Sequence, residues 1–412
     1  MFRNIIRSFL TKGCVALINF MLLIISARYL GISSRGEISI FILNLSMIQI
    51  INEIYTGYTL VHFVPRFNLA KLFSVGIIYT LLFCSLSNLL IVFVNRQVPG
   101  FEWLGYFISF LVLLNTFNCV LIIGKELVIT YNFLSLLQPL TLLVGLGVFI
   151  FVLKDFTFKA YVYPLFISFV LASVISTFVT LKFILKANVD KGFQIKPVLV
   201  NGFLYQAGIL MYVFCNRYSY YLLPDRRDVG LYASAASFVE SVLIIMNGIA
   251  PVLLARVARE GPFGKSTEIT LSLSKLSLLL STLVLFGMLL LPESLFVFVL
   301  GKGFVGIKHL MWLYAPGVLC VSFFGVVANY FLALGKPGLV LFCNSFGCLL
   351  SLLLAPFLVR LYETSGAAYV ADLAYAAIAI ATCFCFFKVG GLPFRRLFSI
   401  KEDYRNVVGL LH

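Results

Sequence analysis

A stretch of 23 residues without a charge runs from Leu72 to Val94 and has the sequence LFSVGIIYTLLFCSLSNLLIVFV. A helix rises about 1.5 Å per residue, so a helix of this length crosses the roughly 30 Å of hydrocarbon in a bilayer. Comparable stretches recur along the whole chain. We therefore predict an all-α polytopic membrane protein with about twelve transmembrane helices: Gly13–Leu30, Ile38–Val64, Leu72–Val94, Trp103–Gly124, Leu127–Leu153, Ala160–Leu185, Val198–Leu223, Val229–Leu254, Leu271–Leu291, Leu310–Leu334, Leu339–Leu361 and Ala367–Phe387.

The composition excludes several classes of protein. Of the 412 residues, 61% are hydrophobic and only 11% are charged, whereas soluble domains carry about 25% charged residues. Soluble enzymes, DNA-binding proteins and disordered chains are therefore excluded. The nine cysteines all lie in apolar stretches and form no CxxC pair. We interpret them as small apolar side chains, and we predict neither a disulfide framework nor a metal site.

The net charge of +15 follows from membrane topology. With the N-terminus in the cytoplasm, the connections on that side carry about twice as many Lys and Arg residues as those on the other side, which agrees with the positive-inside rule. We therefore predict that both termini are cytoplasmic. The excess positive charge then faces anionic membrane lipids, and we expect no nucleic acid as a partner.

The chain contains an internal repeat. The segment Asn118–Lys125 shares Asn, Leu, Gly and Lys with Asn329–Lys336 at a constant offset of 211 residues. A looser match joins the turns after the first and seventh helices. Both matches pair helices that are six apart, so the two halves have the same membrane orientation, which is a transporter architecture with its substrate site between the halves. We predict two six-helix lobes related by this parallel repeat: an N-terminal lobe of residues 1–186, a cytoplasmic linker of residues 187–197, a C-terminal lobe of residues 198–387 and a cytoplasmic tail of residues 388–412.

Four charged residues lie deep in predicted helices. A charge near the centre of a membrane helix raises the free energy of insertion by about 2.5–3.5 kcal/mol, so such residues face protein or water rather than lipid. Polar neighbours share their helix faces, which predicts an aqueous cavity between the halves. The four are Glu53, Arg217, Glu240 and Asp372, and their polar neighbours include Gln49, Asn52 and Thr56 in the second helix and Gln206 and Tyr220 in the seventh.

Two interpretations of these charges stay open. Glu53 and Glu240 are either structural partners of Arg217 or of a backbone group, or ion-coupling residues together with Asp372. Arg217 is either half of a buried ion pair or a ligand that faces the cavity, because a planar guanidinium suits phosphate oxygens better than an ammonium does.

The segment from Arg217 to Ala235 reads RYSYYLLPDRRDVGLYASA. An arginine near the end of one helix, followed by a Val-Gly-x-Tyr-x-x-Ala turn, resembles the signature of polysaccharide flippases, the Wzx-type O-antigen transporters of the multidrug/oligosaccharidyl-lipid/polysaccharide (MOP) exporter superfamily. The chain departs from this pattern at Ser219, where the family often has an acidic residue. Further agreement lies, in the expected order, in Ala27–Gly31 with Arg35 and Gly36, in Leu332–Gly335 and in Gly366–Ala368.

The resemblance implies a V-shaped pair of lobes that flips an undecaprenyl-diphosphate-linked oligosaccharide, an O-antigen or other surface polysaccharide unit, across the bacterial inner membrane by alternating access. It implies that Arg217, with Arg28, attracts the diphosphate. The remaining cavity residues would contact the sugars, and the acidic residues would exchange protons or sodium; no other cofactor is expected. Membrane lipids, a polysaccharide polymerase and chain-length machinery are the implied partners. The cavity residues are Gln206, Gln49, Asn52 and Tyr220, and the coupling residues are Glu53, Glu240 and Asp372.

Two other functions stay open. An ion-coupled exporter of drugs or organic cations from the same superfamily would use the acidic residues to bind its cargo. A membrane-embedded glycan polymerase or ligase would need catalytic room outside the membrane, but the outer connections are short, as at Gly31–Glu37, and Pro292–His309 is expected to be a loop. The three histidines form no cluster, so acid–base or metal catalysis lacks its residues. We therefore predict a transporter without catalytic residues.

Overall fold

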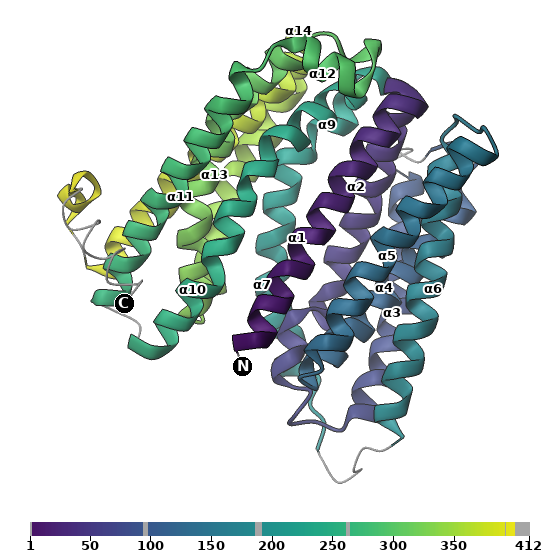
Figure 1. Cartoon of the computed structure of the whole chain (residues 1–412). Helices are drawn as coiled ribbons and strands as arrows, with labels where there is room; N and C mark the ends of the chain where they lie inside the picture. Colours follow the sequence, from purple (N-terminus) through teal and green to yellow (C-terminus); the bar gives the residue numbers. More distant parts are fainter. Residues whose placement is uncertain (1, 94–97, 186–191, 261–263, 392, 400–412) are drawn as a thin grey trace. The chain divides into compact units, whose positions relative to one another are not determined.

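The computed structural model describes residues 2–93, 98–185, 192–260, 264–391 and 393–399, and these residues form helices and no strand. Ten continuous helical stretches among them are long and apolar enough to cross a membrane. Two of these, Leu10–His62 and Pro337–Gly390, are about twice the necessary length. Residues with a non-helical backbone interrupt both: Gly31 and Gly57 the first, and Glu363 the second. The prediction of an all-helical chain with about twelve spanning helices is confirmed (Figure 1).

The first half of the chain contains six long helices joined by short turns. They are α1 (Phe2–Ile25), α2 (Gly31–Thr56), α3 (Leu69–Phe93), α4 (Glu102–Gly124), α5 (Val128–Gly147) and α6 (Lys159–Ile184), with the short helical turns η1 (Ser26–Leu30), η2 (Tyr58–His62) and η3 (Val148–Val152).

The second half contains helices of more varied length. They are α7 (Lys196–Arg217), α8 (Ser219–Leu222), α9 (Arg226–Glu240), α10 (Ile244–Glu260), α11 (Lys265–Leu290), α12 (Glu293–Leu300), α13 (Ile307–Ala333) and α14 (Pro337–Gly390), with the short helical turns η4 (Ser241–Leu243), η5 (Lys302–Phe304) and η6 (Phe394–Phe398).

Three connections differ from the sequence expectation. Residues 31–37 are not a loop, because α2 begins at Gly31, whose positive φ of 81° makes the turn in a single residue. The connection Pro292–His309 contains the helix α12, which is built on the apolar run that ends at Leu300. In α14 the turn between two spans is reduced to Glu363, which has a φ of 49° and a ψ of −122°.

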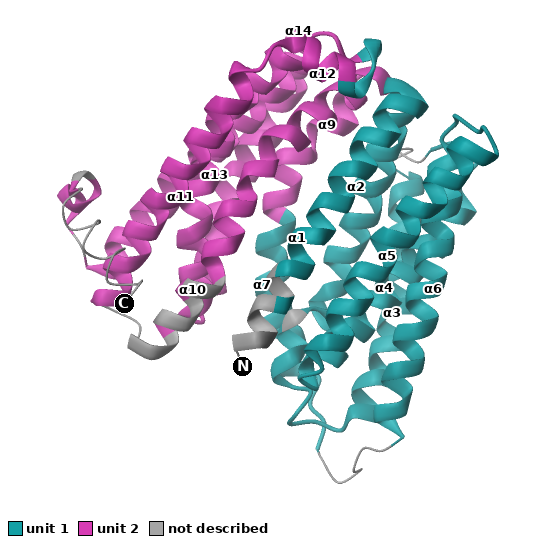
Figure 2. Cartoon of the chain, in the orientation of Figure 1, with its two compact units in different colours: residues 1–210, 299–303 teal, residues 211–298, 304–412 magenta. Residues whose placement is uncertain are grey.

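The chain forms two compact units, which Figure 2 shows in different colours. Unit 1 comprises residues 1–210 and 299–303, and unit 2 comprises residues 211–298 and 304–412. Residues 187–191 of the predicted linker at residues 187–197 lie outside the described residues, as does most of the predicted tail. The boundary between the two units falls within α7, between residues 210 and 211. Gly202 of α7 packs directly on α2: a Cβ added there would overlap the main-chain oxygen of Ile54.

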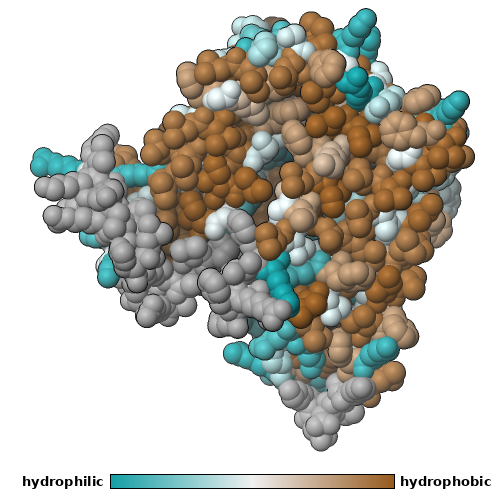
Figure 3. All heavy atoms as spheres, viewed as in Figure 1, coloured by the Kyte–Doolittle hydropathy of each residue, from teal (hydrophilic) through white to brown (hydrophobic). Residues whose placement is uncertain are grey.

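Each unit is built around one central helix. In unit 1, α4 contacts α2, α3, α5 and α6; in unit 2, α13 contacts α9, α10, α11 and α14. Many outward-facing side chains are hydrophobic as well, for example Leu82 and Phe357. Figure 3 shows that hydrophobic residues dominate one face of the molecule, with small hydrophilic areas between them. Such a surface is typical of a protein that is surrounded by lipid.

The two helix ends that match in sequence share a hydrogen-bond geometry in a shifted register. The Leu127 N–H donates to the Ile122 carbonyl, and the Lys336 N–H donates to the Phe331 carbonyl, as in a Schellman motif. The left-handed residues are Glu126 and Gly335, so the structural offset is 209 residues rather than 211. The glycines paired by sequence have different roles: Gly124 is helical and packs against Val64, whereas Gly335 makes the turn.

Candidate functional site

An ion pair joins two helices of unit 2. Arg217 is the last residue of α7 and Glu240 is the last residue of α9. Arg217 Nη2 and Glu240 Oε2 are 2.5 Å apart, and the two side chains are 21% and 19% exposed. Arg217 Nη1 also donates to the Tyr220 hydroxyl, and the guanidinium lies 5.2 Å from the centre of that ring. The guanidinium is therefore paired rather than isolated, which was one of the two interpretations left open.

A cluster of tyrosines surrounds this pair. The Tyr314 hydroxyl donates to Glu240 Oε1 at 2.6 Å and lies 3.2 Å from the Tyr375 hydroxyl. The Tyr375 ring stacks on Tyr212 with ring centres 5.9 Å apart. Tyr232 packs edge-on against the Tyr314 ring. Both carboxylate oxygens of Glu240 therefore accept charged or hydroxyl donors, which holds the carboxylate in place inside an aromatic shell.

Asp372 accepts a hydrogen bond from the backbone of α13, directly after a proline in that helix. Pro316 within this helix lacks an N–H and disturbs the hydrogen bonding of its neighbours. The next backbone N–H, that of Gly317, donates to Asp372 Oδ1 at 2.9 Å. A Cβ added at Gly317 would overlap both Asp372 and Tyr375, so glycine permits this close approach of α14 to α13. Asp372 thus has a backbone partner in the structure.

A second polar group lies in unit 1. Gln49 Nε2 and Gln206 Nε2 donate to the two carboxylate oxygens of Glu53 at 2.7 Å and 3.1 Å. Gln206 is 2% exposed, and its Oε1 is buried without a hydrogen-bond partner. Neither partner of Glu53 is a cation. The prediction that Glu53 belongs to a polar face is consistent with these contacts, and they bring Gln206 of α7 to that face.

The polar residues predicted to share one face of the second helix contact two different neighbouring helices. Glu53 accepts a hydrogen bond from Gln206 of α7, whereas Asn52 is 1% exposed and donates to Thr56 and to Thr80 of α3. Asn52 is therefore placed in the interior of unit 1, away from the Glu53 group. Arg28 lies in η1 on the surface of unit 1 and belongs to neither polar group.

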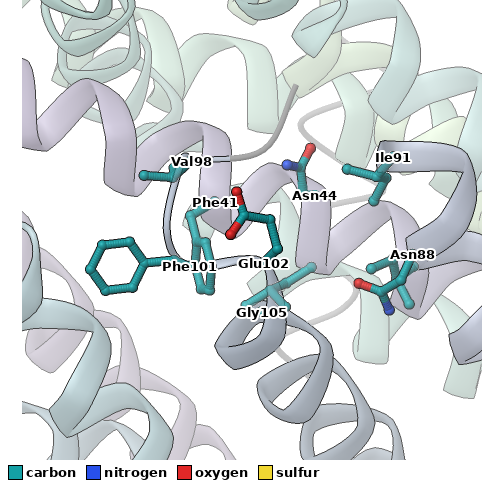
Figure 4. Close-up of a pocket in the computed structure, with 10 residues that line it drawn as sticks. Phe41, Asn44, Asn88, Ile91, Val98, Phe101, Glu102 and Gly105 are labelled. Atoms are coloured by element: carbon teal, nitrogen blue, oxygen red, sulfur yellow. The ribbon is translucent and has the colours of Figure 1, made fainter. Parts of the chain in front are cut away.

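The small cavity in Figure 4 contains none of the predicted site residues. It lies between α2, α3 and α4, where Asn44, Asn88 and Glu102 are among the side chains that line it. Its volume is about 20 Å³, which suits a single water molecule. A sugar or a diphosphate does not fit there. Among the described residues, no group of three or more His, Cys, Asp or Glu side chains is placed to hold a metal ion.

Sequence reasoning missed several members of the unit 2 group. Tyr212 and Tyr314 were not singled out, because an isolated tyrosine in an apolar helix resembles an ordinary core aromatic residue. These tyrosines could have been found from the rule that a buried tyrosine hydroxyl usually has a hydrogen-bond partner. In an apolar helix bundle, an intramembrane carboxylate is a candidate partner.

No family model matches the chain, and no curated protein matches it. Several solved structures are similar to the chain. The lipid II flippase MurJ in an inward closed conformation has a TM-score of 0.68 at 13% identity, covering 100% of this chain and 92% of that one. An inward-facing multidrug resistance MATE family transporter of the MOP superfamily has a TM-score of 0.67 at 13% identity, covering 91% and 94%.

A third similar structure is the MATE multidrug transporter DinF-BH in complex with rhodamine 6G, with a TM-score of 0.66 at 15% identity, covering 95% of each chain. Flippase and drug-transporter structures thus match about equally well. The chain has the multi-helical membrane fold that these three structures share.

Proposed function

We propose that the protein is a membrane transporter that flips an undecaprenyl-diphosphate-linked oligosaccharide, such as an O-antigen or other surface polysaccharide unit. The observation that carries this proposal is the Arg217 guanidinium, which lies at the end of a membrane helix and is still 21% exposed. A bare diphosphate cannot cross hydrocarbon, because an unpaired charge there is too costly. A guanidinium offers five N–H donors, so it can hold phosphate oxygens in a forked geometry.

The ion pair supplies a binding step in which charges exchange partners. An arriving diphosphate competes with Glu240 for Arg217, since both are anions that bind the same N–H groups. Glu240 then keeps only its hydrogen bond from Tyr314. A carboxylate that loses its cation in a partly buried place needs a new counter-charge, which a coupling cation supplies. Substrate binding is thereby linked to ion uptake at Glu240, and a coupling ion acts through its different affinity for the two states.

The other predicted residues take supporting roles in this proposal. Glu53 is a second candidate for ion exchange, because its described partners Gln49 and Gln206 are neutral amides. Asp372 is a third, since its exchange would alter the backbone contact at Gly317. Tyr220 supplies a hydroxyl beside Arg217. Asn52 is the weakest candidate for sugar contact, because it is buried between α2 and α3.

The proposed setting follows from the same function. A lipid-linked surface glycan is assembled at the bacterial inner membrane, so we place the protein there with both termini in the cytoplasm. A polysaccharide polymerase and chain-length machinery would then use the product on the opposite side. Membrane lipids surround the apolar faces of both units.

The alternative function is ion-coupled export of an organic cation. The tyrosine cluster around Glu240 favours this alternative, because aromatic rings and a carboxylate attract cations. The similar DinF-BH structure was determined with rhodamine 6G. Arg217 distinguishes the two substrates, because it would attract a diphosphate and repel a cation.

Transport in vesicles tests the proposal. Arg217→Ala, reconstituted with undecaprenyl-diphosphate-linked oligosaccharide, is expected to flip the lipid at least about tenfold more slowly than the wild type, since a charge-assisted hydrogen bond contributes about 1.5–3 kcal/mol. Arg217→Lys should retain part of the rate. Arg227→Ala is the matched control, because Arg227 is an exposed arginine in the first turn of α9. A folded Arg217→Ala protein that flips at the wild-type rate would refute the role of Arg217.

The coupling is tested separately with neutral amides. Glu53→Gln and Glu240→Gln remove a charge and keep the shape of the side chain. Dependence of flipping on a proton or sodium gradient should weaken in at least one of them. Gradient dependence equal to the wild type in both variants would exclude both residues from coupling.

A further inference from the structure

A polar groove lies between α1 and α5 in unit 1, separate from the groups around Arg217 and Glu53. Its volume is about 280 Å³, and it is lined by the middle of α1 and the N-terminal half of α5. Residues 12, 15 or 16, and 19 of α1 are spaced three or four apart and therefore share one face of the helix. Six side chains in the lining carry polar groups: Thr11, Lys12 and Asn19 of α1 and Tyr131, Asn132 and Ser135 of α5.

The polar lining is suited to an anion. Lys12 carries the charge of the groove, and none of the eight described residues that line it is acidic. The hydroxyls of Thr11 and Ser135 and the amide of Asn19 can donate hydrogen bonds. One ammonium together with several neutral donors is the arrangement that binds a phosphate group.

The groove also has an apolar border. Val15 and Ala16 complete its α1 wall. A soluble phosphate ion gains nothing from such a border, whereas a lipid buries its hydrocarbon chain against it.

The groove is placed at the depth of lipid head groups. Lys12 directly precedes the first predicted apolar span, and α5 begins three residues after Lys125. Basic residues that flank a span lie at the membrane surface, where their ammonium groups meet lipid phosphates.

From these observations we propose that the groove binds the phosphate group of an anionic membrane lipid, with Lys12 as the charged ligand and the lipid chain along Val15 and Ala16. This site goes beyond the proposed transport function, because it involves neither Arg217 nor the identity of the cargo.

The experiment titrates the purified full-length protein in detergent with dioleoylphosphatidylglycerol and follows bound lipid by native mass spectrometry. Lys12→Ala is expected to weaken the tightest lipid binding about tenfold, while Lys12→Arg stays within about twofold of the wild type. Lys125→Ala is the matched control, because it removes an exposed lysine near the same helix ends without touching the groove. Ser135→Leu fills the groove without a charge change and should also reduce binding.

Three results would overturn the proposal. Lys12→Ala could bind the lipid as tightly as Lys125→Ala. A folded Ser135→Leu protein could bind as tightly as the wild type, and this arm remains decisive if Lys12→Ala does not fold. Displacement of the lipid by millimolar inorganic phosphate would assign the groove to a soluble anion. Arg217→Ala should bind phosphatidylglycerol as the wild type does, so failure of the flippase proposal and failure of this one are distinguishable.

Discussion

Replacing Glu240 by glutamine is expected to lower the free energy of unfolding by about 2–3 kcal/mol. Loss of one partner of a fully buried ion pair costs about 3–5 kcal/mol, whereas an exposed pair contributes about 0–1 kcal/mol. The side chains of Arg217 and Glu240 are about four-fifths buried, with exposures of 21% and 19%. The expected loss therefore lies between these limits, toward the buried one. Glutamine keeps an oxygen for the Tyr314 hydroxyl, so the loss reports mainly on the charge pair.

A double-mutant cycle isolates the pair. Arg217→Gln and Glu240→Gln should each destabilise the protein, and the double variant should be much more stable than the sum of the two losses predicts. The coupling free energy is expected to be about 2 kcal/mol, within the usual range for residues in contact. Unfolding in mixed micelles of increasing sodium dodecyl sulfate fraction measures it. Additive losses would show that the two charges do not interact, and the account of substrate exchange at Arg217 would lose its basis.

Two further substitutions test the close helix contacts. Gly202→Ala places a Cβ on the Ile54 carbonyl and should lower the free energy of unfolding of unit 1 by about 1–3 kcal/mol. Gly287→Ala is the control, because Gly287 has open space around it, and it should leave stability unchanged or slightly raised. Equal unfolding midpoints for the two variants would contradict the packing of α7 on α2. Asp372→Ala leaves the Gly317 N–H without its acceptor and should lower the free energy of unfolding by about 1–3 kcal/mol. Asp372→Asn keeps an acceptor, so its loss of stability should be smaller. Hydrogen exchange at the Gly317 amide would detect this difference.

The fold was accessible from the sequence because membrane helices are long and apolar. A stretch such as Leu72–Val94 has one stable conformation in lipid, since each backbone group must be paired within the segment. The turns were less accessible. Gly31 and Glu363 each reverse or bend the chain in one residue, whereas hydropathy alone suggested a loop of several residues in each place.

The polar groups were predictable as faces but not as partners. Helical periodicity placed Gln49, Asn52 and Glu53 on one side of their helix, yet it contains no information on which neighbour covers each part of that side. In the structure, Glu53 is hydrogen-bonded to α7 and Asn52 is hydrogen-bonded to α3. The same limit applies to Arg217 and Glu240, which are 23 positions apart in different helices, so their pairing stayed one of two interpretations.

The substrate is the central claim, and flipping by the wild-type protein tests it most directly. Vesicles that contain the protein and a labelled undecaprenyl-diphosphate-linked oligosaccharide are treated with an impermeant lectin, which reports the glycan on the outer leaflet over time. We expect the protein to accelerate the appearance of glycan far beyond the rate in protein-free vesicles. A rate equal to that of protein-free vesicles, while the same preparation transports rhodamine 6G, would contradict the flippase and support the cation exporter.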